Sequence, residues 1–168
     1  MEQFEGIPNF IKSINRIQRE KILSRIEPPS LIEKILLRRR NVRPIVVDDD
    51  VEGIWYGAYQ KVTQGVRLRF YYTPEAALEA INSISEANQI PTHFVSDGLS
   101  DINAPFELIN ALDKKIRELG LEPGNTTSCY VITLSTPTRQ RASSQNIPSI
   151  DKNDILSGRF KLKEVFLS

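Results

Sequence analysis

The stretch Ile45-Val46-Val47-Asp48-Asp49-Asp50 is the strongest signal in the chain, because a short apolar run ends abruptly in three consecutive carboxylates. Like charges a few ångströms apart repel by several kcal/mol at an effective dielectric of about 20. A cation that offsets this repulsion is therefore expected. Mg²⁺ suits such a strand end, because it binds a few carboxylates and keeps several waters. A solvated acidic turn is the alternative for this stretch taken alone.

Three further apolar runs also end on polar groups. They cover residues 92–97, 128–133 and 146–152, and they end on Asp97, Thr133 and Lys152. In a parallel α/β sheet, ligands bind outside the carboxyl ends of the strands. The acid cluster, the lone Asp, the hydroxyl and the Lys are therefore expected around one crevice.

Helical patterns alternate with these runs and complete the prediction of a fold class. We predict strands at about 45–48, 66–72, 92–97, 128–133 and 146–152, and helices at about 54–64, 73–88, 105–119 and 137–144. The segment 154–168 is ambiguous, because Gly158 interrupts any final helix. Alternating strands and helices predict a doubly wound, five-stranded parallel α/β sheet.

The first 43 residues form a separate region in this prediction, with a second domain over 44–168. Two helices are expected, one from near Pro8 to Pro28-Pro29 and one that starts at the capping box Ser30–Glu33. Two short helices cannot bury their Ile/Leu-rich face alone, so we expect packing on the rest of the chain or on a second copy, giving a homodimer. The run 38–40 consists of three arginines. We interpret it as a solvated helix end that the dipole favours, and a nucleic-acid or phosphate patch is the alternative.

Composition narrows the class of protein. The chain has 168 residues, 40% of them hydrophobic, which is enough for one sizeable core. Its formal net charge of +1 does not indicate nucleic-acid binding, although residues 1–43 hold ten Lys/Arg against five Asp/Glu. Cys129 is the sole cysteine, which excludes an internal disulfide and fits a reducing compartment. With no secretory signal pattern and no run of membrane-spanning length, we expect a cytoplasmic protein.

The ordered motifs 46–49, 94–97, 131–133 and 150–152 resemble the receiver domain of two-component response regulators, which has a flavodoxin-like fold. The resemblance implies that Asp97 accepts a phosphoryl group from a sensor histidine kinase or a phosphotransfer protein. It also implies that Asp48, Asp49, Asp97 and the backbone carbonyl of Leu99 bind Mg²⁺. Thr133 and Lys152 would each contact a phosphoryl oxygen. Signalling would then proceed through altered self-association or through an output domain beyond Ser168.

The chain departs from the family pattern at four positions. Asn153 and Asp101 stand where prolines are usual, Leu134 replaces a small residue, and Ser149 replaces the aromatic switch residue. These departures leave open a second hypothesis, an interaction module that signals without phosphorylation. Ser135 could also take the role of Thr133.

A third hypothesis is an enzyme. The run Asp48-Asp49-Asp50 also resembles the first motif of haloacid-dehalogenase-type phosphatases, with Asp48 as nucleophile and Asp50 as acid. No further acidic pair follows a strand after Lys152, which weighs against this hypothesis.

Overall fold

The computed structural model describes residues 16–168, and within them five parallel strands form one sheet in the order β2-β1-β3-β4-β5. The strands are β1 (Pro44–Val47), β2 (Arg69–Tyr71), β3 (His93–Ser96), β4 (Ser128–Thr133) and β5 (Ser149–Asp151). This order is that of flavodoxin-like sheets, in which the strand order reverses between β1 and β3. The predicted fold class is confirmed.

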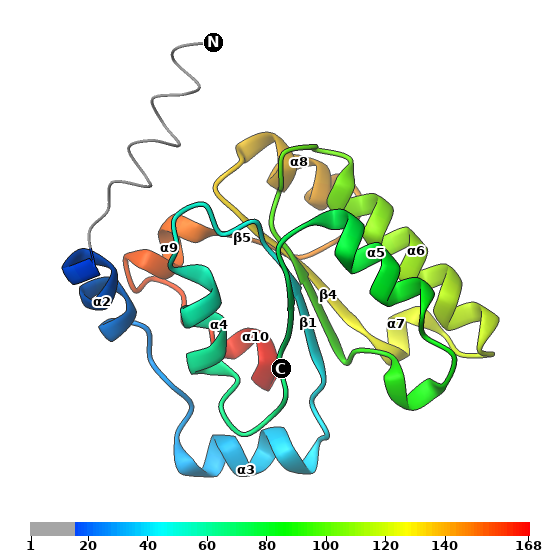
Figure 1. The fold of residues 1–168 in the computed structure, drawn as a ribbon, viewed down its shortest axis with the longest axis horizontal. Helices are drawn as coiled ribbons and strands as arrows, with labels where there is room; N and C mark the ends of the chain where they lie inside the picture. Colours follow the sequence, from blue (N-terminus) through cyan, green and yellow to red (C-terminus); the bar gives the residue numbers. More distant parts are fainter. Residues whose placement is uncertain (1–15) are drawn as a thin grey trace.

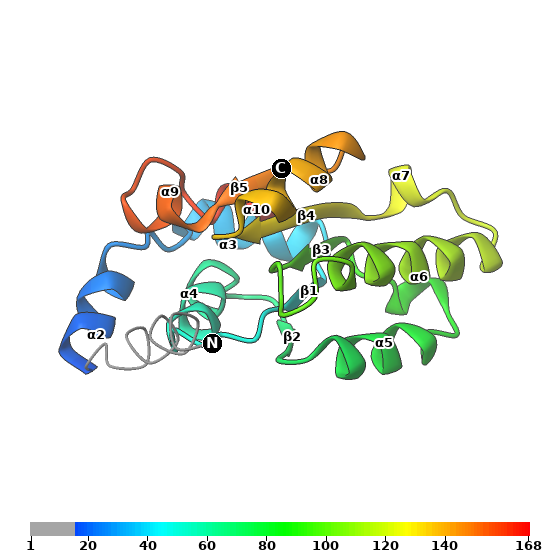
Figure 2. The same ribbon diagram turned by 90° about the horizontal axis from the view of Figure 1, so that it is seen from above.

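Helices cover both faces of the sheet (Figure 1, Figure 2). One face carries α4 (Trp55–Val62), α9 (Lys152–Leu156) and α10 (Glu164–Leu167), and the other carries α5 (Pro74–Asn82), α6 (Ala104–Glu118) and α8 (Thr136–Ser144). Short helical segments η1 (Ala87–Gln89) and α7 (Pro123–Thr126) precede β3 and β4. Helices α2 (Arg16–Ser24) and α3 (Leu31–Arg39) lie before the first strand.

Strand alternation divides the core into two clusters. Val46 and Val95 point to the face covered by α4 and α10, whereas Ile45, Val47 and Phe94 point to the face covered by α5 and α6. Every one of these side chains is buried, so the central strands are apolar on both sides, as expected for a parallel sheet. The polar residues that follow the strands therefore lie at the carboxyl ends of the strands, outside the apolar core.

Several predicted elements are longer than the structure allows, and two of them lie between β1 and β3. The strand predicted at 66–72 is reduced to β2, because the Val66 N–H donates to the Thr63 carbonyl and so belongs to the turn after α4. The helix predicted at 73–88 ends at Asn82. Beyond it, the side chain of Gln89 accepts hydrogen bonds from the backbone N–H groups of Ser85 and Glu86, which organises a separate turn.

The ambiguous C-terminal segment forms two short helices, α9 and α10, separated by Gly158 in the left-handed region (φ 81°). The strand predicted at 146–152 is shortened to β5 from both ends. Asn146 adopts a left-handed φ of 58° after α8, and Lys152 already begins α9.

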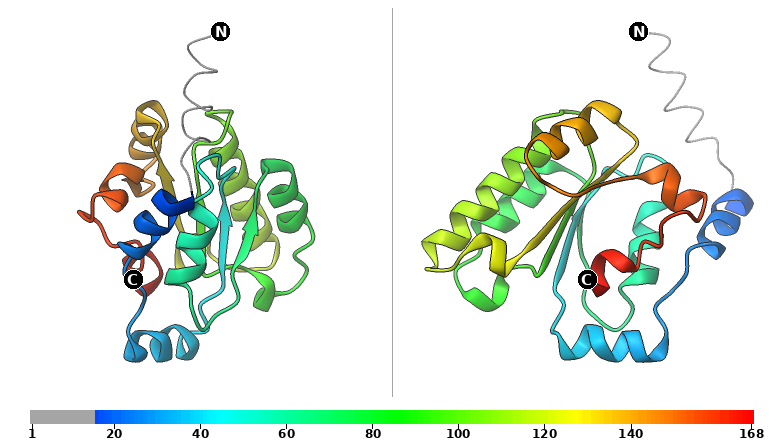
Figure 3. Two further views of the ribbon diagram at one scale, coloured as in Figure 1. Left: turned by 60° about the vertical axis from the view of Figure 1, so that its left-hand side comes forward. Right: turned by 180° about the vertical axis from the view of Figure 1, so that it is seen from behind.

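The two helices predicted before β1 agree with α2 and α3, although the part of the first prediction around Pro8 lies outside the described residues. The predicted capping box is confirmed. Ser30 Oγ accepts from the Glu33 N–H (3.2 Å), and the Glu33 carboxylate accepts from the Ser30 N–H (2.8 Å). Figure 3 shows α3 at one end of the molecule, beyond the N-terminal ends of the strands.

Helix α3 and the end of the chain belong to one core. Leu37 of α3 and Phe166 of α10 are buried in the cluster that also contains Trp55. Arg40 donates to the backbone carbonyl of Leu167 (2.6 Å). Leu37 of the N-terminal region therefore packs on the same sheet face as α4 and α10. Among residues 16–168, no helix is both long enough and apolar enough to cross a bilayer.

This packing predicts that truncation of two apolar residues of α3 changes the free energy of unfolding by very different amounts. Leu37→Ala should lower the free energy of unfolding by about 2–5 kcal/mol, because Leu37 is 1% exposed and its truncation leaves a cavity. Ile32→Ala should change it by less than about 0.5 kcal/mol, because Ile32 is 71% exposed. Urea unfolding measures both, and equal effects would contradict the packing of α3 in the core.

Candidate functional site

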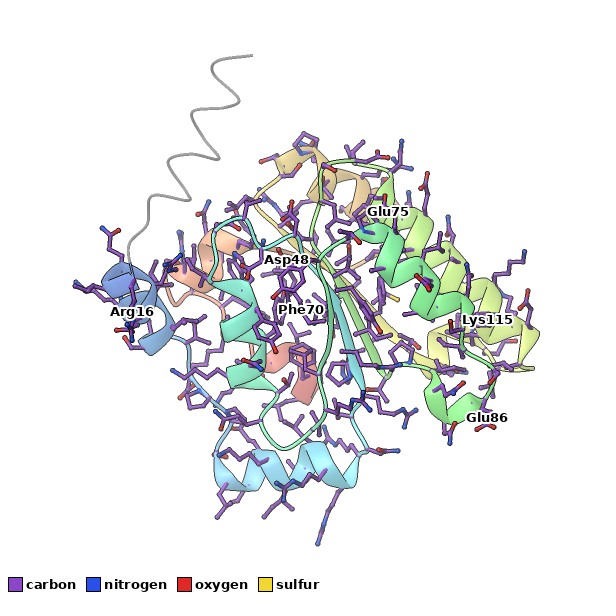
Figure 4. All side chains as sticks on the ribbon, viewed as in Figure 1. Arg16, Asp48, Phe70, Glu75, Glu86 and Lys115 are labelled. Atoms are coloured by element: carbon purple, nitrogen blue, oxygen red, sulfur yellow. The ribbon has the colours of Figure 1, made fainter. Side chains whose placement is uncertain are left out.

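A buried ammonium group joins the ends of three strands. Lys152 Nζ lies 2.9 Å from Oδ2 of Asp48, which follows β1, and 3.3 Å from Oδ2 of Asp97, which follows β3. Lys152 follows β5, so its long side chain reaches across the end of β4. Figure 4 shows Asp48 at this edge of the sheet. The parallel topology thus brings together three of the predicted site residues.

Burial differs among these groups. The side chains of Asp48 and Lys152 are each 1% exposed, whereas that of Asp97 is 12% exposed. Lys152 Nζ also lies 4.6 Å from the centre of the Trp55 ring, a cation–π contact in which the indole packs against the ammonium. Asp97 is therefore the group that a reagent from solvent can reach, and Asp48 and Lys152 lie behind it.

Lys152 keeps its charge in this environment. Burial alone would lower its pKa, but Asp48, Asp97 and Glu52 raise the pKa above its ordinary value. Burial raises the pKa of Asp48, and Lys152 opposes that rise. A protonated Lys152 thus compensates the charge of carboxylates that burial destabilises.

Three carboxylates form a candidate cation site. Oxygen atoms of Asp48, Asp49 and Asp97 all lie within 4.8 Å of one another. Asp48 Oδ2 is buried, and the Lys152 ammonium lies 2.9 Å from it. Hard oxygen ligands clustered in this way fit a Mg²⁺-sized ion.

Asp50 has a different role from its two neighbours. Its Oδ1 accepts hydrogen bonds from the N–H groups of Ile54 (3.0 Å) and Trp55 (2.7 Å), and its Oδ2 accepts one from Tyr56 (3.2 Å). These are N–H groups at the start of α4 that have no partner within the helix. Asp50 therefore caps α4, and Asp48 and Asp49 are the acidic residues left to face Asp97.

Glu52 is a site residue that the sequence analysis did not identify. It is 8% exposed, and its Oε2 has no hydrogen-bond partner among the described residues. Burial raises its pKa, and Lys152 lowers it. The signal was present in the sequence, because the run Asp48–Glu52 contains four carboxylates in five residues.

Thr133 lies beside the residue that follows Asp97. A Cβ atom on Gly98 would come within 2.7 Å of Thr133 Oγ1, so only glycine permits this approach of the two loops. Thr133 Oγ1 accepts from the N–H of Ser135 (3.1 Å), and Ser135 Oγ accepts hydrogen bonds from Thr138 at the start of α8. The Ser135 hydroxyl is thus used to cap α8, which favours Thr133 as the hydroxyl of the site.

Leu99, whose carbonyl the sequence analysis placed among the metal ligands, adopts a left-handed φ of 58°. Such a conformation costs a non-glycine residue on the order of 1 kcal/mol or more, and residues of this kind concentrate at functional sites. Leu99 lies two residues after Asp97, in the loop that follows β3.

Arg139 is a second residue that sequence reasoning missed. Its Nη1 donates to the backbone carbonyl of Thr133 (3.2 Å), and its Nη2 lies 3.4 Å from the carboxylate of Asp151. Asp151 Oδ1 in turn accepts from the N–H of Asn153 (2.9 Å), which caps α9 and places Lys152 in its first turn. Arg139 therefore links the end of β4 to the end of β5. No local pattern signals this contact, since an isolated Arg on a polar helix has many possible partners.

No family model, no curated protein and no solved structure gives a match to this chain.

The repulsion among the clustered carboxylates leads to a prediction about the melting temperature. Burial and the proximity of Asp97 raise the pKa of Asp49, so its ionised form is less favourable in the folded than in the unfolded chain. In EDTA at pH 7, Asp49→Asn should therefore raise the melting temperature, by about 2–4 °C for each kcal/mol of repulsion removed. The gain should disappear as the pH falls below about 3.8, the ordinary value, where wild-type Asp49 is protonated in both states.

Differential scanning calorimetry from pH 3 to pH 7 measures this effect. Glu86→Gln is a matched control, because Glu86 is exposed and remote from the cluster (Figure 4). A lower melting temperature of Asp49→Asn than of wild type at pH 7 would contradict the repulsion argument.

Proposed function

We propose that this protein is a receiver that accepts a phosphoryl group on Asp97 from the phosphohistidine of a sensor kinase or phosphotransfer protein. One observation carries the proposal: a buried Lys152 ammonium lies between Asp48 and the reachable Asp97 at the carboxyl edge of a parallel sheet. An interaction module without chemistry has no need for a lysine buried against two carboxylates, because such a pair costs several kcal/mol per ion in desolvation.

Asp48, Asp49 and Asp97 would hold Mg²⁺, together with the backbone carbonyl of Leu99. Their clustered oxygens and the buried Oδ2 of Asp48 support this assignment. When bound, the ion would neutralise negative charge on the transferring phosphoryl group. The alternative set of Asp48, Asp50 and Glu52 is less suited, because both oxygens of Asp50 already accept backbone N–H groups.

The proposed step is a phosphoryl transfer between two side chains. A carboxylate oxygen of Asp97 forms a bond to phosphorus as the P–N bond of the phosphohistidine breaks, and the imidazole leaves with the electron pair and takes up a proton. Lys152 contributes a compact positive charge for a phosphoryl oxygen. The Thr133 hydroxyl would donate its proton to a second phosphoryl oxygen, while its oxygen can still accept from the Ser135 N–H.

Three of the four departures from the family pattern can be interpreted from their surroundings. Asn153 supplies the N–H that Asp151 accepts, which a proline could not donate. Leu134 is 40% exposed at the surface. Since Ser149 cannot act as an aromatic switch, we assign the coupling between β4 and β5 to Arg139, which contacts Thr133 and Asp151.

Asp97 should gain one phosphoryl group when the protein is incubated with Mg²⁺ and acetyl phosphate. Intact-mass and peptide mass spectrometry would locate the group on Asp97, and hydroxylamine would release it, because it is an acyl phosphate. Asp97→Asn should abolish the adduct, and Lys152→Met should reduce its yield at least tenfold.

Asp113→Asn is the matched control, because Asp113 lies on α6 away from the cluster and should leave the yield unchanged. An adduct on Asp48 would instead favour the phosphatase hypothesis. No adduct, together with no effect of Mg²⁺ on the melting temperature, would favour the phosphorylation-independent module.

We further propose that the protein self-associates through α3, as a homodimer. The outward face of this helix exposes Leu31, Ile32 and Ile35, an apolar patch that is partnerless within residues 16–168. Ile32→Glu should lower the fraction of dimer seen by light scattering, both before and after treatment with acetyl phosphate. Dimerisation that is unchanged in Ile32→Glu would exclude this face, and an exclusively monomeric wild type would exclude the homodimer.

A further inference from the structure

Four arginines line an open pocket of about 440 Å³ at the end of the sheet opposite the acidic cluster. They are Arg38, Arg43, Arg67 and Arg69, and the lining contains no acidic residue. Arg43 directly precedes β1 and Arg69 begins β2, whereas Asp48 follows β1. The pocket is therefore remote from Asp97 and has no part in the function proposed above.

The two arginines at the base of the pocket are half-buried and held in place. Arg43 donates through Nε to the carbonyl of Ile90 (3.1 Å) and through Nη1 to that of Asn41 (3.3 Å). Arg69 donates through Nη2 to the carbonyl of Gln89 (3.2 Å). A guanidinium carries five N–H donors, so each keeps several that these carbonyls do not use.

The two arginines at the rim are exposed. Arg38 donates through Nε to the carbonyl of Gly65 (3.2 Å), which anchors the end of α3 to the turn before β2. Arg67 makes no hydrogen bond or ion pair with another residue in the 16–168 part of the chain. The rim thus combines one anchored guanidinium with one that is unengaged.

The positive charge of the pocket is not compensated within the described part of the chain. Ion pairs there involve other cations, and none of the four arginines lies within 4 Å of a carboxylate. Burial lowers the pKa of Arg69, and the nearby Arg43 and Arg67 lower it further. Four mutually repelling cations around a cavity are stabilised by an anion bound between them.

We propose that this pocket binds a small anion built of linked phosphate groups, with one phosphate held by Arg43 and Arg69 at the base and the next by Arg38 and Arg67 at the rim. Guanidinium groups suit this task, because their planar fork binds phosphate oxygens in pairs. The volume lies within the range of small-molecule sites and accommodates a diphosphate or triphosphate chain. Free inorganic polyphosphate and the phosphate chain of a nucleotide share this chemistry.

Titration calorimetry of the full chain with inorganic tripolyphosphate tests the proposal. EDTA is present throughout, so that no divalent ion recruits phosphate to the acidic cluster. Wild type should bind one tripolyphosphate, and Arg67→Gln should bind it at least tenfold more weakly. Arg117→Gln removes the same charge from an exposed position on α6 and should bind like wild type. Asp97→Asn should also bind like wild type, which separates this site from the phosphorylation site.

Parallel titrations with ATP distinguish the two sources. Equal affinity for ATP and tripolyphosphate identifies the phosphate chain as the whole ligand. At least tenfold tighter binding of ATP identifies a nucleotide whose other groups also contact the pocket. The side-chain amides of Asn41 and Asn88 line the pocket and are available for such contacts. Both results support the proposal. No binding by wild type, or an equal loss in Arg67→Gln and Arg117→Gln, would overturn it. So would binding of single-stranded RNA alone, because the arginines would then serve a nucleic-acid surface.

Discussion

The rest of the site depends on the buried contact between Lys152 and the carboxylates of Asp48 and Asp97. Two ions removed from water lose several kcal/mol of hydration each, and their attraction recovers this only with close geometry. Here the ammonium lies 2.9 and 3.3 Å from the two carboxylates and against the Trp55 ring. This contact determines where the loops after β1 and β3 and the start of α9 must lie.

The same contact explains why the local structure around it is unusual. Asp50 adopts a left-handed φ of 51° and caps α4, which turns the chain so that Asp48 and Asp49 face the other strand ends. Gly98 permits the loop after Asp97 to approach Thr133. Asp151 caps α9 and so places Lys152 in the first turn of that helix. Asp50 and Asp151 each accept backbone N–H groups and at the same time position charged side chains of the site.

The two ends of the strands carry side chains of opposite charge. The carboxyl ends carry the acidic cluster, and the opposite end carries the arginine pocket formed by the C-terminus of α3, the segment before β1, and β2. Helix α3 connects the arginine pocket to the core, because Leu37 is buried beside α4 and α10 while Arg38 lies at the pocket. The N-terminal region therefore contributes to the hydrophobic core and to the charged surface.

Local sequence patterns were sufficient to predict the sheet, the alternation of strands and helices, the capping box at Ser30 and the polar residues at the strand ends. These follow from local patterns, because apolar periodicity and capping residues act within a few positions of each other. Three features of the site were visible only in the folded chain: Lys152 spans the end of β4, Asp50 caps a helix, and Glu52 is buried near the cluster. The gathering of Arg38, Arg43, Arg67 and Arg69 in one pocket is a fourth. These outcomes depend on contacts between residues far apart in the chain, and strand order and helix packing set those contacts.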